Sequence, residues 1–204
     1  MAVIHQPSIA DARIVSDASE PLILVDGQDA VVGTLDKDAC HNGDGVLHRA
    51  FSAFVFNSAG ELLMQQRADD KRLWPGYWSN SCCSHPRSGE SMDEAVVRRL
   101  EQELGFRADL EFVYKFEYQA PFYNSEGLEG SEHELCSVYV GRFDGQVNAN
   151  PNEVKQWQWI APGELGSQLE HQAERFTPWF QMEWRTLTQS YAQHLARTVS
   201  PAQP

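Results

Sequence analysis

Cys83 and His85 are the residues whose types and spacing point most directly to chemistry in this chain. They lie two positions apart in the segment 79–86, and an extended backbone would project both side chains from one face. A thiol can donate or accept a proton, and an imidazole can bind a metal ion. The pair therefore predicts a site that combines proton transfer with metal binding, provided that other segments supply partners for both side chains.

A second group of side chains could supply a metal centre. His41 and His48 flank a turn-like, glycine-bearing segment, and Glu132 and Glu134 would share one face of an extended strand. Together with His85 they offer three imidazoles and two carboxylates, a set that suits a divalent transition metal in octahedral coordination. Taken alone, each histidine is more often an ordinary surface or core residue.

The other candidate side chains have simple structural interpretations when they are taken one at a time. Cys83 fits a small buried apolar residue, and Cys82, which points to the opposite face, fits that role better. Aromatic side chains belong by default to the core and charged side chains to the solvated surface. The aromatic candidates are Tyr118 and Trp179, and the charged candidates are Lys37, Arg67, Lys71, Arg99 and Glu103.

The bulk composition restricts the partners of the protein. A chain of 204 residues is expected to form one domain, and 29 acidic against 16 basic side chains give a net charge of −13. This charge argues against nucleic acid or an anionic membrane as partner, and an anionic substrate would need local cations. No apolar run reaches the roughly 18 residues of a membrane span. The N-terminal segment lacks the pattern of a secretory signal, so we expect a cytoplasmic protein whose cysteines are thiols or ligands rather than disulfides.

The elements that position these side chains can be predicted from apolar periodicity and turn signals. We expect a β-hairpin over 47–67 and a capping box at Ser91 and Glu94 that begins a helix ending near Leu104. An aromatic-rich helix is expected over 178–197. Further strands are expected at 21–25, 109–120, 134–143 and 154–160, with a loop at 122–130.

The order of these elements favours an α+β fold, because strands are followed by isolated helices rather than by regular βαβ units. We expect a layered α/β/α domain with a mixed central sheet. The chain divides into a loosely held N-terminal arm (1–20), one domain (21–185) and a C-terminal helical extension of that domain (186–204).

The predicted helix after residue 91 carries a longer pattern. Glu90 and the run 98–106 resemble the Nudix box, a loop–helix motif that places a row of carboxylates on metal-bound diphosphate. Ser84 stands at the first glycine of the box, Arg99 at the glutamate after the arginine, and Gln102 at one of the paired glutamates. Fewer carboxylates weaken the metal cluster that supports hydrolysis. A Nudix-like fold and one metal ligand, Glu103, can therefore persist in a protein that has lost hydrolysis.

Taken in order, these motifs resemble the type I isopentenyl-diphosphate isomerases, which are Nudix-fold enzymes. The resemblance covers residues 21–185, and its joint order and spacing are specific to that family. It implies reversible conversion of isopentenyl diphosphate to dimethylallyl diphosphate through a tertiary carbocation, in isoprenoid biosynthesis. It rests on segments 34–37, 41, 47–52, 74–76, 80–86, 132–134 and 177–179 and on the altered box.

The same resemblance implies roles for individual residues. Cys83 and Glu134 match the two groups that transfer protons on opposite sides of the carbon chain, and Tyr118 matches the tyrosine that hydrogen-bonds the carboxylate. Trp179 matches the pocket tryptophan, whose aromatic face can stabilise a carbocation. Which of Cys83 and Glu134 protonates first in each direction is left open.

The resemblance also implies two metals and a set of cations for an allylic or homoallylic diphosphate substrate. One divalent metal (Mn²⁺, Mg²⁺ or Zn²⁺) would be held by His41, His48, His85, Glu132 and Glu134, and Glu103 would hold a Mg²⁺ that bridges to the diphosphate. Lys37, Arg67, Lys71 and Arg99 fall at diphosphate-binding positions. The alternatives are a Nudix pyrophosphohydrolase and a non-catalytic metal-binding module. The oligomeric state is left open.

Overall fold

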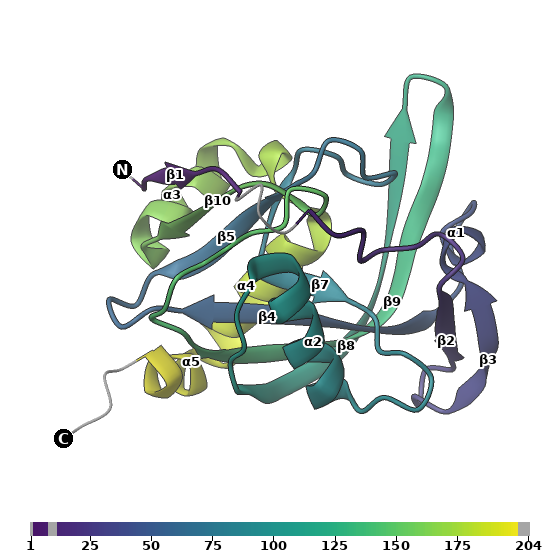
Figure 1. The fold of residues 1–204 in the computed structure, drawn as a ribbon, viewed down its shortest axis with the longest axis horizontal. Helices are drawn as coiled ribbons and strands as arrows, with labels where there is room; N and C mark the ends of the chain where they lie inside the picture. The colour runs from purple at the N-terminus through teal and green to yellow at the C-terminus, as the bar shows by residue number, and fades with distance from the viewer. Residues whose placement is uncertain (1, 8–11, 200–204) are drawn as a thin grey trace.

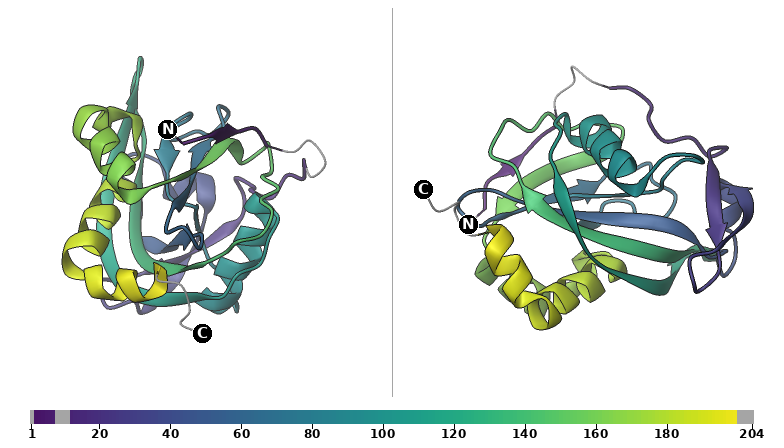
Figure 2. Two further views of the ribbon diagram at one scale, coloured as in Figure 1. Left: turned by 90° about the vertical axis from the view of Figure 1, so that its left-hand side faces the viewer. Right: turned by 90° about the horizontal axis from the view of Figure 1, so that it is seen from below.

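A mixed β-sheet lies between two layers of helices in the computed structural model of the protein, which describes residues 2–7 and 12–199 (Figures 1 and 2). Helix α2 (Met92–Leu104) covers one face, and α3 (Pro162–His171), α4 (Pro178–Ser190) and α5 (Ala192–Val199) cover the other. The predicted layered α+β fold is therefore confirmed. No helix in the described part of the chain is both long and apolar enough for a membrane span.

The central path of the sheet runs in the order β1, β10, β5, β4, β2, β3. These strands are β1 Ile4–His5, β2 Pro21–Val25, β3 Val31–Asp36, β4 His48–Phe56, β5 Leu62–Arg67 and β10 Val154–Ile160. Off this path, β9 (Gly127–Arg142) runs parallel to β4 and pairs with β8 (Leu110–Asn124). Short helical segments lie at α1 (Lys37–Cys40) and η2 (Ala173–Arg175).

Strand β4 separates two apolar cores because its side chains alternate between the faces of the sheet. Phe54 and Phe56 pack in the core beneath α4, whereas Phe51 and Val55 pack in the core beneath α2. The even-numbered positions of β4 therefore face the α4 layer. His48 and Ser52 belong to this set, which places a polar row at the end of an otherwise apolar strand.

Strands β4 and β5 do not form the continuous hairpin that we expected over 47–67. They pair only beside the turn, at Phe56 and Leu62, and then diverge. The segment 78–84 fills the gap: β6 (Trp78–Ser79) pairs with β5, and β7 (Cys82–Ser84) pairs with β4. Ser81 joins the two sides, because its buried hydroxyl accepts from the amide of Val55 and donates to the carbonyl of Leu63.

The β8–β9 hairpin is longer than the sequence indicated. The predicted loop at 122–130 is mostly strand, since pairing continues to Asn124 and Gly127 around a two-residue turn. The hairpin stands out from the body of the molecule beside α1 (Figure 1). Its extra length carries residues 130–134 past α1, where the predicted carboxylates lie.

The helices confirm the predicted start and end of α2 and correct the predicted C-terminal helix. Ser91 and Glu94 form the predicted capping box, and Gly105 ends α2 in a left-handed conformation (φ 74°). The single helix predicted over 178–197 is two helices. The helix is interrupted at Tyr191, and α5 then packs against β9. Tyr191 stacks on Tyr114 at the break, with ring centroids 4.9 Å apart.

The N-terminal arm is held to the domain by many hydrogen bonds, so the expectation of a loose arm was wrong. β1 pairs with β10, and the side-chain amides of Asn150 and Asn152 donate to the carbonyls of Arg13 and Ala12. Residues 1 and 8–11 of this arm and residues 200–204 of the predicted extension lie outside the described residues.

Candidate active site

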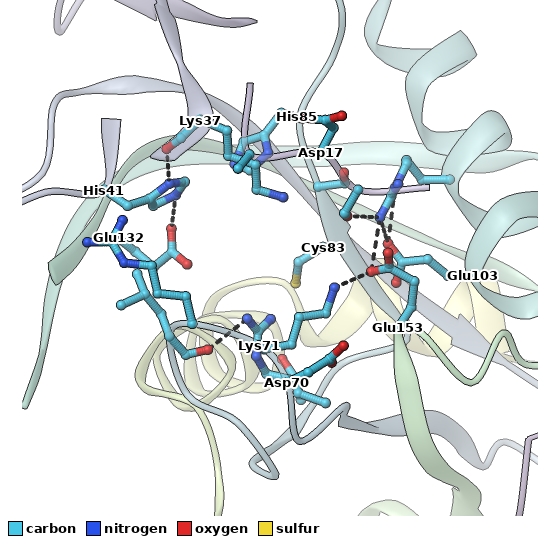
Figure 3. A pocket seen from close by; sticks show the side chains of 18 of the residues that line it. Asp17, Lys37, His41, Asp70, Lys71, Cys83, His85, Glu103, Glu132 and Glu153 are labelled. Atoms are coloured by element: carbon cyan, nitrogen blue, oxygen red, sulfur yellow. Dashed lines mark hydrogen bonds and ion pairs between the residues drawn. The ribbon is translucent and has the colours of Figure 1, made fainter. Parts of the chain in front are cut away.

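One cavity of about 410 Å³ gathers the predicted site residues. It opens where β4 and β5 diverge, between the arm, α1 and the β8–β9 hairpin. Figure 3 shows Cys83 between two charged groups, with His41 and Glu132 on one side and Lys71, Glu103 and Glu153 on the other. Every predicted site residue lines this cavity except His48, which lies directly behind His85.

Three imidazoles and a carboxylate converge beside the cavity. The ligand atoms of His41, His48, His85 and Glu134 all lie within 4.8 Å of one another. Strand register produces this arrangement, because His48 of β4 is the cross-strand partner of Glu134 of β9. Glu132, two residues earlier on β9, adds a carboxylate oxygen 2.7 Å from His41 Nε2.

The tautomers of two histidines make the cluster suitable for a cation. Nδ1 of His41 lies 2.6 Å from the Lys37 carbonyl and Nδ1 of His48 lies 2.7 Å from the Val46 carbonyl, and a carbonyl can only accept. Each ring therefore donates through Nδ1 and turns Nε2 into the cluster, where a metal would take the place of a proton. Burial opposes the charged form of His41, but the Glu132 carboxylate at Nε2 outweighs it and raises the pKa of that ring. His48 Nε2 and His85 Nε2 face each other at 3.2 Å beside the Glu134 carboxylate. This donor set of imidazoles and carboxylates fits a divalent metal.

The electrostatics of the cluster follow from burial and from these contacts. Burial lowers the pKa of His85 to about 4, which keeps its ring neutral. Burial opposes the charged form of Glu134, but the contacts with the His48 and His85 imidazoles outweigh it and hold the pKa of that carboxyl well below its usual range. A neutral imidazole beside an ionised carboxylate is the protonation state in which both groups bind metals.

Glu134 also contacts the cavity through Tyr118. The Tyr118 hydroxyl donates to Glu134 Oε2 at 2.7 Å, and the two residues are direct partners across the β8–β9 hairpin. Burial and the Glu134 charge raise the pKa of the Tyr118 hydroxyl well above its usual value, so it keeps its proton at neutral pH. The Tyr118 hydroxyl therefore faces the cavity while it is hydrogen-bonded to the Glu134 carboxylate.

Cys83 lies on β7 with its thiol held by two polar side chains. Its Sγ donates to Asn80 Oδ1 at 2.9 Å and lies 3.2 Å from Ser52 Oγ, its neighbour across the β4–β7 pair. The Asn80 amide is fixed because its Nδ2 donates to the carbonyls of Ala53 and Cys82. Burial and nearby carboxylates raise the pKa of the Cys83 thiol far above its usual range, so the resting group is a thiol that can donate a proton.

The cations at the other end of the cavity are paired with carboxylates. Lys71 Nζ lies 2.5 Å from Glu153 Oε2, and Arg99 lies 2.5 Å from Glu103 and 3.4 Å from Glu153. Burial and the charges of Lys71 and Arg99 lower the pKa of the Lys37 ammonium. These cations lie close together and face the cavity, which is the arrangement needed to bind a polyanion.

Arg67 and Trp179 form the wall between the two ends of the cavity. The Arg67 guanidinium lies 5.4 Å from the centre of the Trp179 ring and donates to the carbonyls of Leu73 and Trp74. The Trp179 indole N–H donates to Ser79 Oγ at 3.1 Å, which fixes the ring. An aromatic face therefore lies beside Cys83 and Tyr118.

Several side chains at the site were missed by the sequence interpretation. Ser52 and Asn80 contact the Cys83 sulfur, and Glu153 pairs with Lys71 and Arg99. Backbone and hydroxyl groups of Val15 and Ser16 in the arm accept from Arg99. Asn80 lies inside the 80–86 segment and could have been found there, whereas no motif marks Glu153 or the arm.

The altered Nudix box has become part of the scaffold. Arg98 forms a two-point ion pair with Glu90, at 2.6 and 2.8 Å, and donates to the carbonyl of His85. Arg99 occupies the next position, where the box has a glutamate. It points into the cavity and pairs with Glu103 and Glu153. The box thus connects α2 to the loop that carries His85.

Comparison with known proteins places this arrangement in a family. The NUDIX domain model matches residues 46–180. The isopentenyl-diphosphate Delta-isomerase 1 of Photorhabdus laumondii is 45% identical over 84% of this chain and 97% of its own length. The chain belongs to the isopentenyl-diphosphate Delta-isomerase family. The corresponding Escherichia coli isomerase is 38% identical over 86% of this chain and 98% of its own.

Solved structures agree on the fold of this isomerase-family chain. A crystal structure of a Deinococcus radiodurans protein matches with a TM-score of 0.61 at 25% identity, over 88% of this chain and 99% of that one. A MutT protein from Methanosarcina mazei matches with a TM-score of 0.57 at 16% identity, over 71% and 95%. The second likeness is one of fold alone. The predicted family and Nudix-like fold are confirmed.

Proposed function

We propose that the protein interconverts isopentenyl diphosphate and dimethylallyl diphosphate in isoprenoid biosynthesis. The observation that carries the proposal is the arrangement of one cavity: Cys83 and the Tyr118–Glu134 pair face it together with the cations that would bind a diphosphate. Two proton-transfer groups can then reach one short carbon chain whose polar end is fixed. The names of the relatives, at 38–45% identity over most of the chain, support the same activity.

The chain's own groups can carry both proton transfers. One group adds a proton to the terminal double bond, which leaves a tertiary carbocation, and the other removes a proton from the neighbouring carbon. The Cys83 thiol acts on one side of the carbon chain, and the Glu134 carboxylate acts on the other through the Tyr118 hydroxyl. The reverse reaction exchanges the two roles, so either group serves as acid or base according to direction.

The cavity would protect the carbocation from water. Cys83 and Tyr118 lie against an aromatic wall in which Trp74 contacts Trp179 edge-on, with ring centroids 5.1 Å apart. An aromatic face stabilises a nearby cation by about 0.5–2 kcal/mol, more as water is removed. Exclusion of water also prevents capture of the cation as an alcohol.

Two metal positions complete the proposal. His41, His48, His85, Glu132 and Glu134 would hold one divalent metal, which is Mn²⁺, Mg²⁺ or Zn²⁺ and would keep Glu134 ionised and oriented. Glu103, whose buried carboxylate accepts from Arg99 and Gln65, would hold a Mg²⁺ that accompanies the diphosphate. Carboxylate oxygen is the ligand that Mg²⁺ prefers.

The diphosphate would bind between Lys37, Arg67, Lys71 and Arg99. Lys71 and Arg99 are held in place by Glu153 before substrate arrives, and this lowers the cost of ordering long side chains on binding. These cations supply the local positive field that a chain of net charge −13 needs for an anionic substrate. We further propose that residues 21–185 form the isomerase domain, with the arm adding Ile14 and Ser16 to the cavity wall.

A product analysis tests this function against its rivals. The purified protein is incubated with isopentenyl diphosphate and Mg²⁺, and the reaction is assayed in parallel for dimethylallyl diphosphate and for released phosphate. We expect the allylic isomer and no phosphate, because Arg99 and Gln102 replace carboxylates of the hydrolytic box. Phosphate without isomer would support a pyrophosphohydrolase, and neither product would support a non-catalytic metal-binding module.

A further inference from the structure

Glu183 is a buried carboxyl group that the proposed reaction does not use. It lies on α4 one turn after Trp179, so both side chains face the sheet. Its side chain is fully buried, its Oε1 accepts from the Cys136 thiol at 3.6 Å, and its Oε2 has no hydrogen-bond partner among the described residues. A buried carboxyl oxygen without a partner is costly and needs a reason.

The Ser52 hydroxyl connects Glu183 to Cys83. Ser52 Oγ lies 3.2 Å from Cys83 Sγ, and Cys136 Sγ lies 3.5 Å from Ser52 Oγ and 3.6 Å from Glu183 Oε1. The Cys136 sulfur therefore contacts both the hydroxyl and the carboxyl. Neither Ser52 nor Glu183 lines the cavity, so the carboxyl lies behind the thiol on the α4 side of the sheet.

Ser52 has one proton to donate, and two groups can accept it. The Cys83 thiol gives its own proton to Asn80, which leaves its sulfur free to accept a hydrogen bond from Ser52. An ionised Glu183 would be the stronger competitor, because hydrogen bonds to a full charge are stronger than those to a neutral sulfur. The protonation state of Glu183 thus decides whether the Ser52 hydroxyl donates its hydrogen bond to the Cys83 sulfur or to the Glu183 carboxylate.

Burial makes Glu183 neutral near physiological pH. It raises the pKa of the carboxyl to about 8, against the opposing effect of the Ser52 and Cys136 contacts. The titratable groups that face it are Cys83 on β7, Cys136 and Glu134 on β9 and Tyr114 on β8. All of them are acids, so no cation among the described residues opposes the effect of burial.

We propose that Glu183 is a positioning residue for Cys83: protonated, it leaves the Ser52 hydroxyl free to hydrogen-bond the Cys83 sulfur, and ionised, it takes that hydroxyl for itself. When Cys83 donates its proton to the substrate, negative charge develops on the sulfur, and the Ser52 hydrogen bond stabilises it. Ionised Glu183 removes this stabilisation and adds a negative charge nearby. This role rests on the proposed isomerase function and adds an alkaline limit to it.

The test is the pH dependence of kcat for isopentenyl diphosphate in the metal-loaded enzyme. In the wild type, kcat falls as pH rises through about 8. Glu183→Gln keeps the shape and the neutral state of the group, so we expect a neutral-pH kcat close to wild type and no fall between pH 7 and 9. At neutral pH, Ser52→Ala is expected to lower kcat by about tenfold to a hundredfold, the cost of one hydrogen bond to a developing charge, and the difference from wild type should shrink above pH 8, where ionised Glu183 has already taken the hydroxyl. At neutral pH, where Glu183 is protonated, adding Glu183→Gln to Ser52→Ala should have no further effect.

Tyr114→Phe is the matched control. It removes a hydrogen bond to the backbone carbonyl of Glu183 and leaves the carboxyl untouched, so the alkaline fall should persist. An alkaline fall that persists in Glu183→Gln would overturn the proposal. So would loss of activity in Glu183→Gln at every pH, which would mean that the carboxyl itself supplies the proton.

Thermal unfolding separates this inference from the proposed function. A carboxyl whose pKa is raised on folding binds its proton more tightly in the folded state, so stability falls as pH rises from about 4.3 towards 8. Glu183→Gln should lose this part of the pH dependence of Tm. If the wild type makes no isomer but the Tm difference is present, the isomerase function fails and the titration of Glu183 stands. If isomer forms and the kcat profiles of wild type and Glu183→Gln coincide, only the inference fails.

Discussion

Cys82 and Cys83 are adjacent thiols with opposite surroundings. Cys82 is fully buried in the core beneath α2, and Cys83 faces the cavity with Ser52 and Asn80 at its sulfur. Alternation along β7 accounts for the difference, since neighbouring side chains of a strand point to opposite faces. The identity of the reactive thiol is therefore a consequence of backbone geometry and not of the chemistry of cysteine.

Replacement of Cys83 should remove turnover without loss of the fold. Cys83→Ser puts a far weaker acid in the same place, and we expect kcat to fall by about 10²- to 10⁴-fold, the usual contribution of a proton-transfer group. Circular dichroism and Tm should stay near wild type. Cys82→Ala is the matched control and should lower Tm while kcat is retained. Full activity in Cys83→Ala would exclude the thiol as an acid or base.

At the residue scale, the proton-transfer residues could be predicted from the sequence, whereas the residues that position them could not. Cys83, Tyr118 and Glu134 could be assigned because they matched a family pattern. Ser52 lies in the 47–52 segment but received no role there, because a serine in an apolar strand does not by itself indicate a contact, and a glutamate in an aromatic helix carries no local signal for Glu183. Their role appears only once β4, β7 and α4 are packed together.

The inserted segment 78–84 is the element on which the site depends. Ser81 joins β4 and β5 through its hydroxyl and so fixes the strand that carries Cys83. The pattern of residues 47–67 favoured an ordinary hairpin because the predicted turn does form, with Phe56 paired to Leu62 beside it. Divergence of the strands depends on a segment distant in sequence, and periodicity within the hairpin cannot reveal that. By contrast, the Ser91 cap and the Gly105 end of α2 are local and were predicted correctly.

Ser81→Ala should therefore destabilise the protein and misplace Cys83. Each buried backbone group left without its partner costs about 1–3 kcal/mol. We expect a lower Tm and a lower kcat, measured by calorimetry and by isomer formation. Ser88→Ala, at an exposed serine of the following loop, is the control and should change neither. Unchanged Tm and kcat in Ser81→Ala would refute this role of the hydroxyl.

Gly130 is required where β9 passes α1. A Cβ at this position would lie 2.2 Å from the carbonyl oxygen of His41, a backbone atom that cannot move alone. Gly130→Ala should displace His41 from the metal cluster and cost about 1–3 kcal/mol of stability. Weaker Mn²⁺ or Zn²⁺ binding by calorimetric titration is the expected result. Gly163→Ala, where a Cβ meets no atom within 4 Å, is the control. Equal metal affinities in the two variants would contradict this account.

The whole molecule brings two charged groups to one cavity from segments that alternate along the chain. The metal cluster comes from β4, β9 and the residues directly after α1 and β7, and the cations come from α1, β5, the following loop and α2. Fold class and family could be predicted because they depend on the order of motifs over most of the chain. Attachment of the arm could not, since its bonds to Asn150 and Asn152 join segments about 140 residues apart and use backbone carbonyls that every sequence has.

Metal binding should stabilise the whole domain. The cluster joins β4 and β9 to the residues that follow α1 and β7, so a chelator should lower Tm and added Mn²⁺ or Zn²⁺ should restore it. A ligand at 100 times its dissociation constant stabilises by about 2.7 kcal/mol. His41→Ala should lose this response, whereas His171→Ala, at an exposed histidine of α3, should keep it. A Tm that is the same with chelator and with metal would count against a metal centre.

The central claim is that two groups of this chain transfer protons to and from one carbon skeleton. Incubation with isopentenyl diphosphate and Mg²⁺ in deuterated water, followed by NMR, tests it most directly. Cys83 and Tyr118 carry exchangeable protons, so the product should be dimethylallyl diphosphate with deuterium in the methyl group formed from the terminal methylene. Cys83→Ala should give no labelled product. Absence of dimethylallyl diphosphate from the wild-type reaction, or its formation without deuterium, would contradict the account.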